Sequence, residues 1–571
     1  MIRRRPRSLA RRLSTVLAAG AAAAILLAGC VSIPFDGPVV ENPIASDDDN
    51  AELTLAPPRG PRDGATPEEI VQGFAAAGIG PQDGYAIAKQ FLTPEFAAEW
   101  SPNERVLVVQ GRGTPVSSGP DAYELNLMVE AEVDNVGRYT TVATSTSTVL
   151  DFDLVEVDGQ WRIDEAPNGT VVVAANFRSV FDAYPLYFFD PSLRFLVPDL
   201  RWFPRLPTAS SRIVRSLLEG PSSWLASGAL VTAFPTGTQL VAPPTVDEAT
   251  ATIDLSAEVL AADASTKRRI VQQLQQSLIS LDTITSIALT VNEIPVDVPD
   301  IDVRVPEAAP RVDPNPLVLR DERFGFLSGS NLTEVPGVSD VLADLEPTGA
   351  VLARPSDGEA PSAAALTSDG VAVVRSEESV LLDARSGLIT PSMDPHGFVW
   401  SVPAGSPDAL QAFGPDNSPH SVISGLSASS RVVSLEISRD GTRALIAVQT
   451  PSGPSLLVAA IRRGSDLVPL SLGTPLVLPT SSTELLDVAW VDGSSVAVLE
   501  ADGGQSRVRV WQVGGVDQLL GGLVDGIQIV GGNNGTDGLR IVDADGALHQ
   551  TSSGGGWRRT GTVVSLLATQ Q

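Results

Sequence analysis

The last third of the chain consists of short β-patterned runs that are interrupted by Asp-Gly pairs. In residues 435–448, two such runs flank Asp440-Gly441. The Asp-Gly pairs at Asp440, Asp492 and Asp545 are 52 and 53 residues apart, close to the length of a propeller blade. Radial blades protect strand edges that would otherwise aggregate. We therefore predict that residues 317–571 form a β-propeller. The alternative is a β-sandwich, whose turns usually recur every 8–12 residues or so without a longer period.

The first residues have the pattern of an export signal. Six arginines crowd residues 3–12, and an uncharged apolar stretch covers residues 16–28. That stretch is too short for a membrane span, which needs about twenty residues, so we expect residues 1–29 to be cleaved. Export through the general secretory route is favoured, because the residues around Arg11-Arg12 match the twin-arginine pattern poorly.

The end of this signal resembles the lipobox of bacterial lipoproteins, because it is Leu27-Ala28-Gly29-Cys30. The resemblance implies cleavage between Gly29 and Cys30, with Cys30 carrying an N-palmitoyl and an S-diacylglycerol group. Two or more acyl chains give stable anchoring, whereas one is marginal. The alternative is an ordinary secreted protein in which Cys30 falls here by chance. The expected location is the outer face of the cell membrane.

Composition limits the remaining possibilities. Cys30 is the single cysteine of 571 residues, so stability must come from packed cores rather than disulfides. With 43% hydrophobic residues, the length supports two to four domains. Loss of the signal arginines lowers the formal net charge from −29 to about −35, which excludes nucleic acid as a partner.

The chain divides into a tether, two small domains, a connector and the propeller. Residues 30–64 are rich in proline and include Asp47-Asp48-Asp49, which we interpret as solvated linker rather than a calcium site. Six prolines fall within residues 295–316, which indicates a stiff connector. The predicted divisions are 1–29 signal, 30–64 tether, 65–183 first domain, 184–294 second domain, 295–316 connector and 317–571 propeller.

The first domain is predicted to be α+β. Thr66, Pro67 and Glu69 form a capping box before a helix that buries Ile70, Val71 and Phe74. Strands follow, and the last pair turns at Asp158-Gly159, a hairpin signal. Helices before an antiparallel sheet suggest a cone like that of nuclear-transport-factor-2-like domains.

The second domain is also predicted to be α+β. A helix over residues 213–218 ends at Gly220-Pro221, and a second helix covers Ile270 to Leu278. Residues 253–255 and 287–291 alternate as strands, so two helices on one small mixed sheet are expected. The aromatic residues near its start are predicted to be core, with a docking surface as the alternative: Tyr184, Tyr187, Phe188, Phe189, Phe195, Trp202 and Phe203.

No catalytic, metal or cofactor site emerges from the sequence. The three histidines, His396, His420 and His549, lie far apart and are expected in loops or on the surface. Gly531-Gly532-Asn533-Asn534-Gly535 could hold an anion, but we interpret it as a loop between blades. Asp543 and Asp545 could serve a glycosidase, although the sequence cannot place two carboxylates at the required separation. Neither a nucleophile elbow nor a phosphate-binding loop is found.

With these residues in view, the chain resembles the LpqB family of actinobacterial lipoproteins. The resemblance covers nearly the whole length and rests on an ordered set of motifs: 27–34 around the lipobox, 90–95, Gln160-Trp161-Arg162-Ile163-Asp164, Pro167-Asn168-Gly169, 186–191, 196–199, 218–221 and 438–444. It implies a middle domain of the GerMN type, named for spore-germination proteins, and the family's propeller at the end. It also implies an accessory role beside the sensor kinase MtrB and its response regulator MtrA.

The leading hypothesis is therefore a non-enzymatic lipoprotein that binds the kinase's extracellular sensor domain and affects envelope homeostasis and cell division. A hydrolase of the envelope with its site at the propeller mouth is one alternative, and carboxylates converging on the channel would favour it. A wall-glycan or solute binder is the other, and a deep aromatic pocket would favour it.

Overall fold

The computed structural model describes residues 58–571, apart from residues 227, 282, 354–359, 481, 483, 524 and 553–555. The chain separates into one unit of Met1–Ala51 and a second of Glu52–Gln571. The predicted signal, the Cys30 attachment site and most of the tether therefore lie outside the described residues. Within the described part, no helix is both long and apolar enough to cross a membrane.

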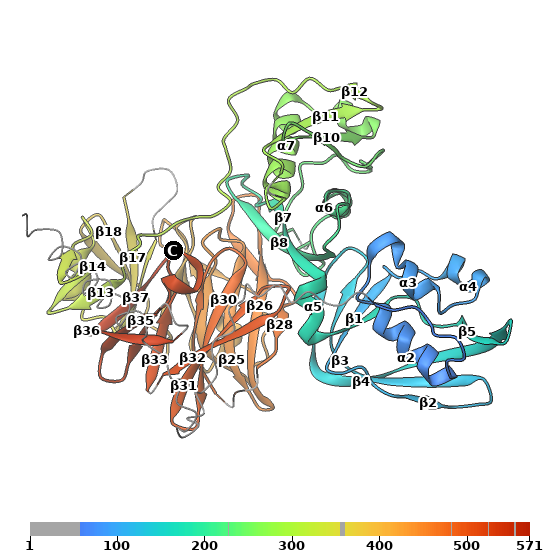
Figure 1. Ribbon diagram of the computed structural model, residues 1–571. Coiled ribbons are helices and arrows are strands. Elements are labelled where there is room, and N and C mark those ends of the chain that lie inside the picture. Colours follow the sequence, from blue (N-terminus) through green and yellow to red (C-terminus); the bar gives the residue numbers. More distant parts are fainter. Residues whose placement is uncertain are drawn as a thin grey trace, which may run out of the picture. The chain divides into compact units, whose positions relative to one another are not determined.

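The N-terminal domain begins with helices (Figure 1). They are α2 (Pro67–Ala77), η1 (Gln82–Gly84), α3 (Ala86–Lys89) and α4 (Pro94–Glu99). At the start of α2 the Thr66 hydroxyl accepts the N–H of Glu69, and the Glu69 carboxylate accepts the N–H of Thr66. These bonds pair two amides that a helix start leaves free, so the predicted capping box is confirmed.

The sheet of this domain has the strand order β5-β4-β3-β1-β6, with β2 paired to β3. Only the β1–β6 pair is parallel. The β4–β5 turn has φ of 53° at Asp158 and 74° at Gly159, which confirms the predicted hairpin. The strands are β1 (Arg105–Val109), β2 (Pro115–Ser117), β3 (Ala122–Asp134), β4 (Tyr139–Val157), β5 (Gln160–Glu165) and β6 (Thr170–Val173).

Apolar residues fill both faces of this sheet. On one face Leu107, Leu125 and Leu127 pack with Ile70 and Phe74 of α2. On the other face the strands pack with α5 (Ala174–Val180) and the hairpin that follows it. The predicted α+β class is confirmed; the comparison with a nuclear-transport-factor-2-like cone stays a prediction.

The second domain opens with a hairpin, β7 (Phe181–Phe189) and β8 (Leu196–Pro204), outside its main sheet. The main sheet has the order β12-β11-β10-β9, and only β10 and β11 are parallel. Gly220, with φ of 91°, ends α6 at the predicted position. The remaining elements are α6 (Ala209–Glu219), β9 (Thr245–Asp247), β10 (Thr250–Leu255), η2 (Ala257–Ala261), α7 (Ala264–Leu278), β11 (Ser286–Val291) and β12 (Ile294–Pro295).

The aromatic residues predicted as core are buried, with Tyr187 as the half-buried exception. They divide between two cores. Tyr184, Phe188, Phe195 and Phe203 belong to the core of the second domain. Trp202 instead packs with the first domain's sheet and α5.

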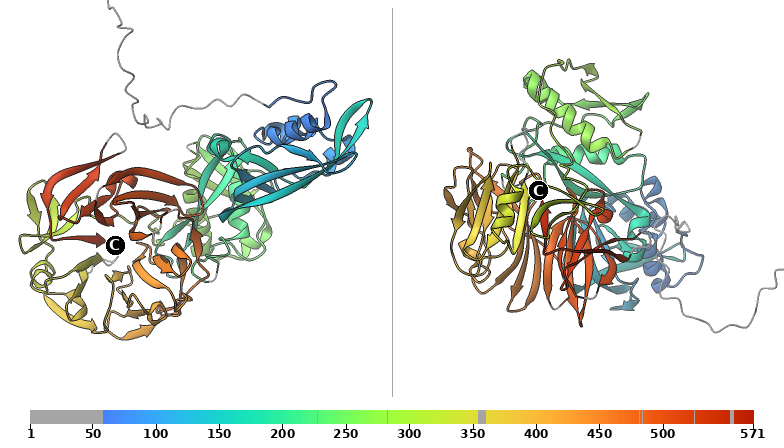
Figure 2. Two further views of the ribbon diagram at one scale, coloured as in Figure 1. Left: turned by 90° about the horizontal axis from the view of Figure 1, so that it is seen from below. Right: turned by 90° about the vertical axis from the view of Figure 1, so that its left-hand side faces the viewer.

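The described part of the C-terminal region forms six four-stranded antiparallel blades around an axis (Figure 2). The last strand, β37, pairs with β13 to complete the first blade and runs parallel to β16 of the second, so the ring closes. The first two blades are β37 (Leu566–Gln570), β13 (Leu317–Arg320), β14 (Arg323–Ser328) and β15 (Asn331–Thr333), then β16 (Gly349–Ala353), β17 (Ser362–Thr367), β18 (Gly370–Arg375) and β19 (Glu378–Asp383). The third and fourth are β20 (Ser392–Met393), β21 (Val399–Ser401), β22 (Gln411–Phe413) and β23 (Pro419–Ser421), then β24 (Arg431–Ile437), β25 (Arg443–Thr450), β26 (Gly453–Arg463) and β27 (Pro469–Leu472). The fifth and sixth are β29 (Leu485–Trp490), β30 (Ser495–Asp502), β31 (Gln505–Gln512) and β32 (Asp517–Leu523), then β33 (Gly526–Val530), β34 (Arg540–Asp543), β35 (Ala547–Thr551) and β36 (Trp557–Val563).

The blade period predicted from the Asp-Gly turns is wrong in one place. Asp440 and Asp492 join the first and second strands of their blades, whereas Asp545 joins the second and third. Blades differ in length because some carry additions, such as β28 (Leu476–Leu478), which pairs with β26. The Gly531–Gly535 segment fills the first turn of the last blade, before η4 (Gly535–Gly538), so its assignment between blades was also wrong. Short helices α8 (Ser339–Asp344) and η3 (Pro407–Ala409) occupy other connections.

The proline-rich connector is held to its neighbouring domains at several points along its length. Glu307 forms a β-bridge with Phe195 of the second domain. Further on, the N–H of Val312 donates to Asn533 Oδ1 at 3.1 Å, and Asn533 Nδ2 donates to the Val312 carbonyl at 2.6 Å. The connector is therefore bonded to both domains that it joins.

Candidate functional site

The axis of the propeller encloses a large polar cavity, which we call the axial channel. Its volume is about 260 Å³. The inner strands of successive blades contact one another around it, and the C-terminal residue lies near the axis (Figure 2). Its walls are Thr348, Val351, Ile389, Thr390, Pro391, Ser392, Val433, Ser434, Leu435, Glu436, Leu486, Asp487, Ile527, Gln528 and Thr569.

Glu436 is the most buried ionisable group of the channel wall. Strand β24 places it between Leu435 and Ile437, and its carboxylate accepts bonds from Thr569 Oγ1 at 3.0 Å and the N–H of Trp490 at 3.3 Å. Burial, with the nearby charge of Asp487, raises the pKa of Glu436 to about 8. The hydrogen bonds from these neutral donors lower the pKa of Glu436, but by less than burial raises it.

Asp487 lies on β29, the inner strand of the next blade. Ser434 Oγ donates to its Oδ1 at 2.8 Å, and the N–H of Ile529 donates to its Oδ2 at 3.0 Å. Burial raises the pKa of Asp487 to about 6, against the effect of these donors. Each carboxylate thus connects inner strands of different blades, and the two hold their protons in different pH ranges.

The two ends of the channel differ. Where the inner strands begin, Ile527 is 52% exposed, so this end is open to solvent and forms a mouth. Near the other end, Gln571 Nε2 donates to the Ile437 carbonyl at 2.7 Å, and Gln571 Oε1 accepts the N–H of Met393 at 3.0 Å. Arg439 donates to the Gly532 carbonyl at 3.0 Å across the turns at this end.

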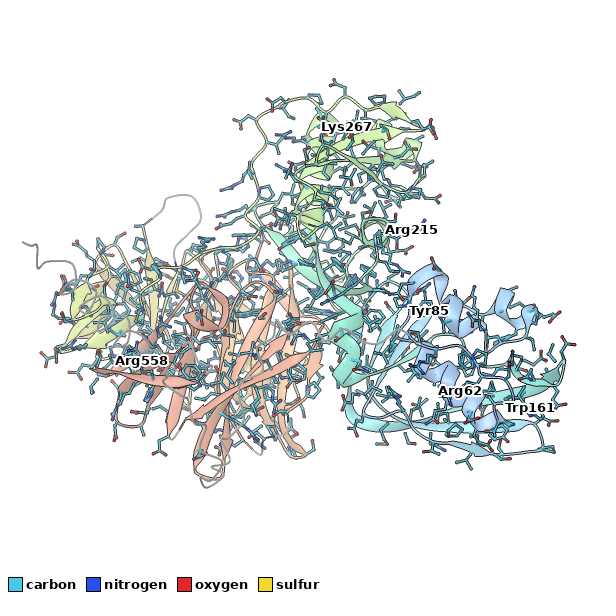
Figure 3. The ribbon with its side chains drawn as sticks, in the orientation of Figure 1. Arg62, Tyr85, Trp161, Arg215, Lys267 and Arg558 are labelled. Atoms are coloured by element: carbon cyan, nitrogen blue, oxygen red, sulfur yellow. The ribbon has the colours of Figure 1, made fainter. Side chains whose placement is uncertain are left out.

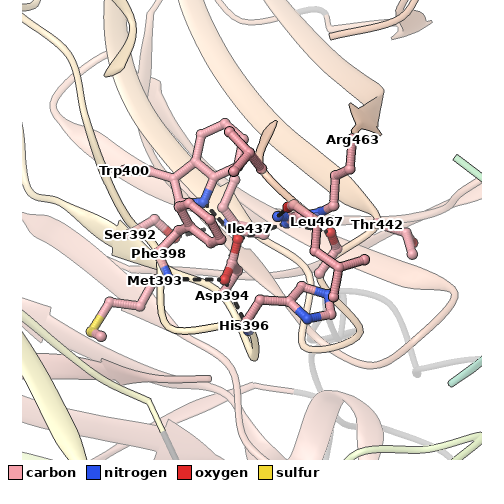
Figure 4. A network of polar contacts seen from close by, with 12 residues as sticks. Ser392, Met393, Asp394, His396, Phe398, Trp400, Ile437, Thr442, Arg463 and Leu467 are labelled. Carbon is pink, nitrogen blue, oxygen red and sulfur yellow. Dashed lines mark hydrogen bonds and ion pairs between the residues drawn. The ribbon is translucent and has the colours of Figure 1, made fainter. Parts of the chain in front are cut away.

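Buried Asp–Arg pairs join blades outside the channel (Figure 4). Arg463 of the fourth blade lies 2.6 Å from Asp394 of the third, whose other donors include Trp400 Nε1 at 3.0 Å. Burial alone would raise the pKa of Asp394, but the Arg463 charge holds it below the ordinary value. Arg443 pairs with Asp440 and donates to the Gly493 carbonyl of the fifth blade at 2.7 Å. These pairs have a structural role.

A second hollow lies in the N-terminal domain, between α2 and the sheet. Phe74 and Trp100 pack in its wall with ring centroids 5.1 Å apart and planes tilted by 58°, and Arg105 and Asn168 also line it. It encloses about 20 Å³, roughly the space that one water molecule needs. The pocket is aromatic, but in this form it is too small to support the solute-binding hypothesis.

The Pro167-Asn168-Gly169 motif builds the rim of that hollow. Asn168 Oδ1 accepts the N–H of Ser101 at 2.9 Å, and Asn168 Nδ2 donates to Glu104 at 2.8 Å. Gly169 has φ of 103°, and a Cβ there would lie 2.5 Å from the Arg105 carbonyl oxygen. The motif's residue types therefore follow from local backbone geometry.

The structure separates the residues that the sequence singled out. His396 lies in the β20–β21 turn, as expected for a loop or surface histidine, whereas His420 and His549 lie in strands β23 and β35 and are half-buried. His549 contacts Asp543 at 2.9 Å, whereas Asp545 is an exposed turn residue, so these two acids do not form a matched pair. Among the described residues, no three His, Cys, Asp or Glu side chains are grouped to hold a metal.

The channel carboxylates were missed at the sequence level. A signal for them exists, because Glu436 and Asp487 interrupt otherwise apolar strands, Leu435-Glu436-Ile437 and Leu486-Asp487-Val488. A charged residue inside a buried strand is uncommon and needs a reason. The sequence does not tell which face of each strand lies toward the propeller axis, so it could not predict that Glu436 and Asp487 line the same channel.

These features define a multidomain, mainly β protein: two α+β domains followed by a propeller with a polar axial channel. Three family models match it in order: the N-terminal domain of lipoprotein LpqB over residues 60–178, the sporulation and spore germination domain over 185–297, and the LpqB β-propeller domain over 322–566. The chain belongs to the LpqB family of lipoproteins.

Relatives named lipoprotein LpqB match over different shares of the chain. The Bifidobacterium longum protein is 27% identical over 79% of this chain and 80% of its own, and the Thermobifida fusca protein is 24% identical over 83% and 86%. The match to the Cutibacterium acnes protein, at 28% identity, covers 47% of this chain and 45% of that relative.

Solved structures give weaker similarity. The tandem GerMN domains of the Bacillus subtilis sporulation protein GerM match with 15% identity and a TM-score of 0.19, over 34% of this chain and 59% of that one. TolB from Acinetobacter baumannii matches with 13% identity and a TM-score of 0.28, over 43% and 64%. Neither score supports an inference about this chain.

Proposed function

We propose that this chain is a lipid-anchored extracytoplasmic protein that binds the extracellular sensor domain of an MtrB-type sensor kinase. Through that kinase and the response regulator MtrA it would affect envelope homeostasis and cell division. The observation that carries the proposal is the ordered match of all three domains to the LpqB family. The resemblance supplies the partner.

The anchor gives this binding its physical basis. Lipid at Cys30 confines the protein to the membrane surface from which the kinase domain projects. Confinement raises the effective concentration of each partner for the other without any new contact. A protein that binds one sensor conformation better than another then shifts the kinase equilibrium by that difference in affinity.

One test removes the anchor and leaves the folded domains unchanged. A Cys30→Ser protein that is exported but released from the membrane should lose most of its effect on an MtrA-dependent reporter. The control is the wild-type chain at equal abundance, measured by immunoblot. A released protein that supports signalling as well as wild type would contradict the anchoring step.

A second test locates the binding surface. Arg62, Arg215 and Arg558 are exposed and are labelled in Figure 3; they lie in the region that the first family model matches, in the second domain and in the propeller. A photo-crosslinking amino acid at each position, in intact cells, should join the chain to the kinase sensor domain from at least one of them. Crosslinks to other envelope proteins alone would contradict the proposed partner.

An envelope hydrolase is the second candidate. It is favoured by one observation: Glu436 and Asp487 face the same channel with pKa values raised to about 8 and about 6. Pairs of carboxyl groups with separated pKa values are typical of acid–base catalysis. Release of soluble fragments from purified cell wall by the wild type, and not by a Glu436→Gln variant, would select this function.

A further inference from the structure

The buried carboxylates of the propeller differ in whether they contact a basic side chain. Among its described residues, five buried acids each contact a basic side chain: Asp383 with Arg385, Asp394 with Arg463, Asp440 with Arg443, Glu500 with Arg507 and Arg509, and Asp543 with Arg559 and His549. Glu436 is only 8% exposed, yet its carboxylate contacts the neutral donors Trp490 and Thr569 and pairs with no cationic side chain among the described residues. Arg439 influences Glu436 only by its charge, since its guanidinium donates to Gly532.

An unpaired buried carboxylate is unfavourable, because it loses hydration and gains no counter-charge. Elsewhere the propeller supplies an arginine or histidine from its own chain. In the axial channel it supplies hydroxyls, one amide and two acids, Glu436 and Asp487, and none of the lining residues is cationic. Burial therefore keeps Glu436 protonated up to about pH 8, and a cation that would let it ionise has to come from outside the chain.

The cavity limits what that charge can be. Its volume of about 260 Å³ is many times the 10–15 Å³ or so that one water needs. Two carboxylates fall short of the acidic ligand sets that calcium sites use, and no three metal-ligating side chains are grouped among the described residues. An organic cation fills the space better and can donate to several acceptors at once.

The order of residues along the channel gives the shape of the ligand. Ile389, Val433, Leu486 and Ile527 lie at or near the starts of four inner strands, beside the mouth, and are only partly buried. The polar groups of Ser434, Asp487 and Glu436 come later along their strands. A ligand with an aliphatic stem and a charged head matches this order along the channel. The stem would lie against the apolar residues near the mouth, and the head would lie deeper, beside the polar groups.

We propose that the axial channel binds a single alkylammonium or guanidinium group. Its charged head enters first through the mouth and pairs with Glu436 and Asp487, and its aliphatic stem stays nearer the mouth. The group can belong to a free amine or to a lysine or arginine of a partner chain. The proposal goes beyond the function proposed above, because it requires neither the kinase nor the lipid anchor.

Calorimetric titration of the purified full chain tests the site. The probes are n-pentylamine, Nα-acetyl-lysine amide and, as a neutral control, 1-pentanol. At pH 7 an amine should bind and the alcohol should not, with protons released on binding because the bound charge ionises Glu436. Proton release is measured by comparing two buffers of different ionisation enthalpy.

Variants assign the binding to the channel. Glu436→Gln and Asp487→Asn should each weaken amine binding about tenfold or more, the usual effect of losing a charge-assisted bond. Glu484→Gln removes an exposed acid three residues before Asp487 and should leave affinity unchanged. Gln528→Lys places a cation in the channel and should abolish binding, and this variant keeps the test valid if Glu436→Gln fails to fold.

The outcomes separate the sources of the cation. Stronger binding of pentylamine indicates a free amine, and stronger binding of the blocked lysine indicates a side chain of a partner. No binding by either amine, equal binding of the alcohol, or amine binding that survives both Glu436→Gln and Gln528→Lys would overturn the proposal.

Discussion

Glu436 gives the folded protein a pH dependence that an exposed glutamate would not. Its pKa is raised from 4.5 to about 8 in the fold, so the folded chain holds a proton that the unfolded chain has released between these pH values. Stability therefore falls as pH rises from about 4.5 to about 8. Asp487, raised to about 6, adds to the fall over the lower part of this range.

The first prediction follows from that sign. Between pH 5 and pH 8 the propeller's unfolding temperature should decrease, and Glu436→Gln should reduce this decrease, because glutamine has no proton to lose. Differential scanning calorimetry at several pH values measures the effect. Glu484→Gln, outside the channel, should keep the wild-type slope; an unchanged slope in Glu436→Gln would contradict the assignment.

The second residue-scale prediction concerns the Asp394–Arg463 pair (Figure 4). Arg463→Met leaves a fully buried carboxylate without its counter-charge, so the propeller should lose about 3–5 kcal/mol of stability. Adding Asp394→Asn removes that charge and should recover part of the loss. Urea unfolding of both variants provides the comparison, and a double variant as unstable as the sum of its single changes would contradict the argument.

At the scale of elements, the third prediction compares two glycines with left-handed backbones. Gly169 has φ of 103° and no room for a Cβ, whereas Gly159 has φ of 74° and nothing within 4 Å of a Cβ. Gly159→Ala should cost about 1–2 kcal/mol from backbone strain alone. Gly169→Ala should cost clearly more, because Arg105 must also move. Calorimetry of the N-terminal domain tests this order, and equal losses would refute the steric explanation.

Local signals predicted the elements that depend on local physics. The capping box at Thr66, the hairpin at Asp158-Gly159 and the helix end at Gly220 are all present, since each rests on a few neighbouring residues. The propeller class also followed from the sequence, because short strands with tight turns leave few ways to protect their edges.

Long-range features were beyond the same reasoning. Asp545 looks like Asp440 in sequence, yet it occupies a different turn because loop lengths vary between blades. Glu436 and Asp487 meet only because neighbouring inner strands align around an axis, and their separation of 51 residues carries no sign of this. Register between blades is fixed by packing, so the candidate site could not be predicted.

At the scale of the whole molecule, contacts from distant parts of the sequence join the second domain to the propeller. Trp202 Nε1 of the β7–β8 hairpin donates to the Gly514 carbonyl at 3.1 Å, and Ala460 packs in the second domain's core. The connector adds the Val312–Asn533 bonds. The predicted stiff connector is thus one of several links, and we expect these two domains to unfold together.

Closure of the ring leads to the fourth prediction. Strand β37 pairs with β13, about 250 residues earlier, and with β16 of the adjacent blade, so no other strand can replace it. A chain that ends at Val564 should expose the edges of β13 and β16 and lose the propeller's cooperative unfolding transition. Removal of Gln571 alone deletes its side-chain bonds near the channel end and one backbone bond to the Leu352 carbonyl, and should lower the unfolding temperature modestly. Calorimetry with limited proteolysis distinguishes the two chains: if the chain ending at Val564 kept a protease-resistant propeller, the ring would not depend on β37.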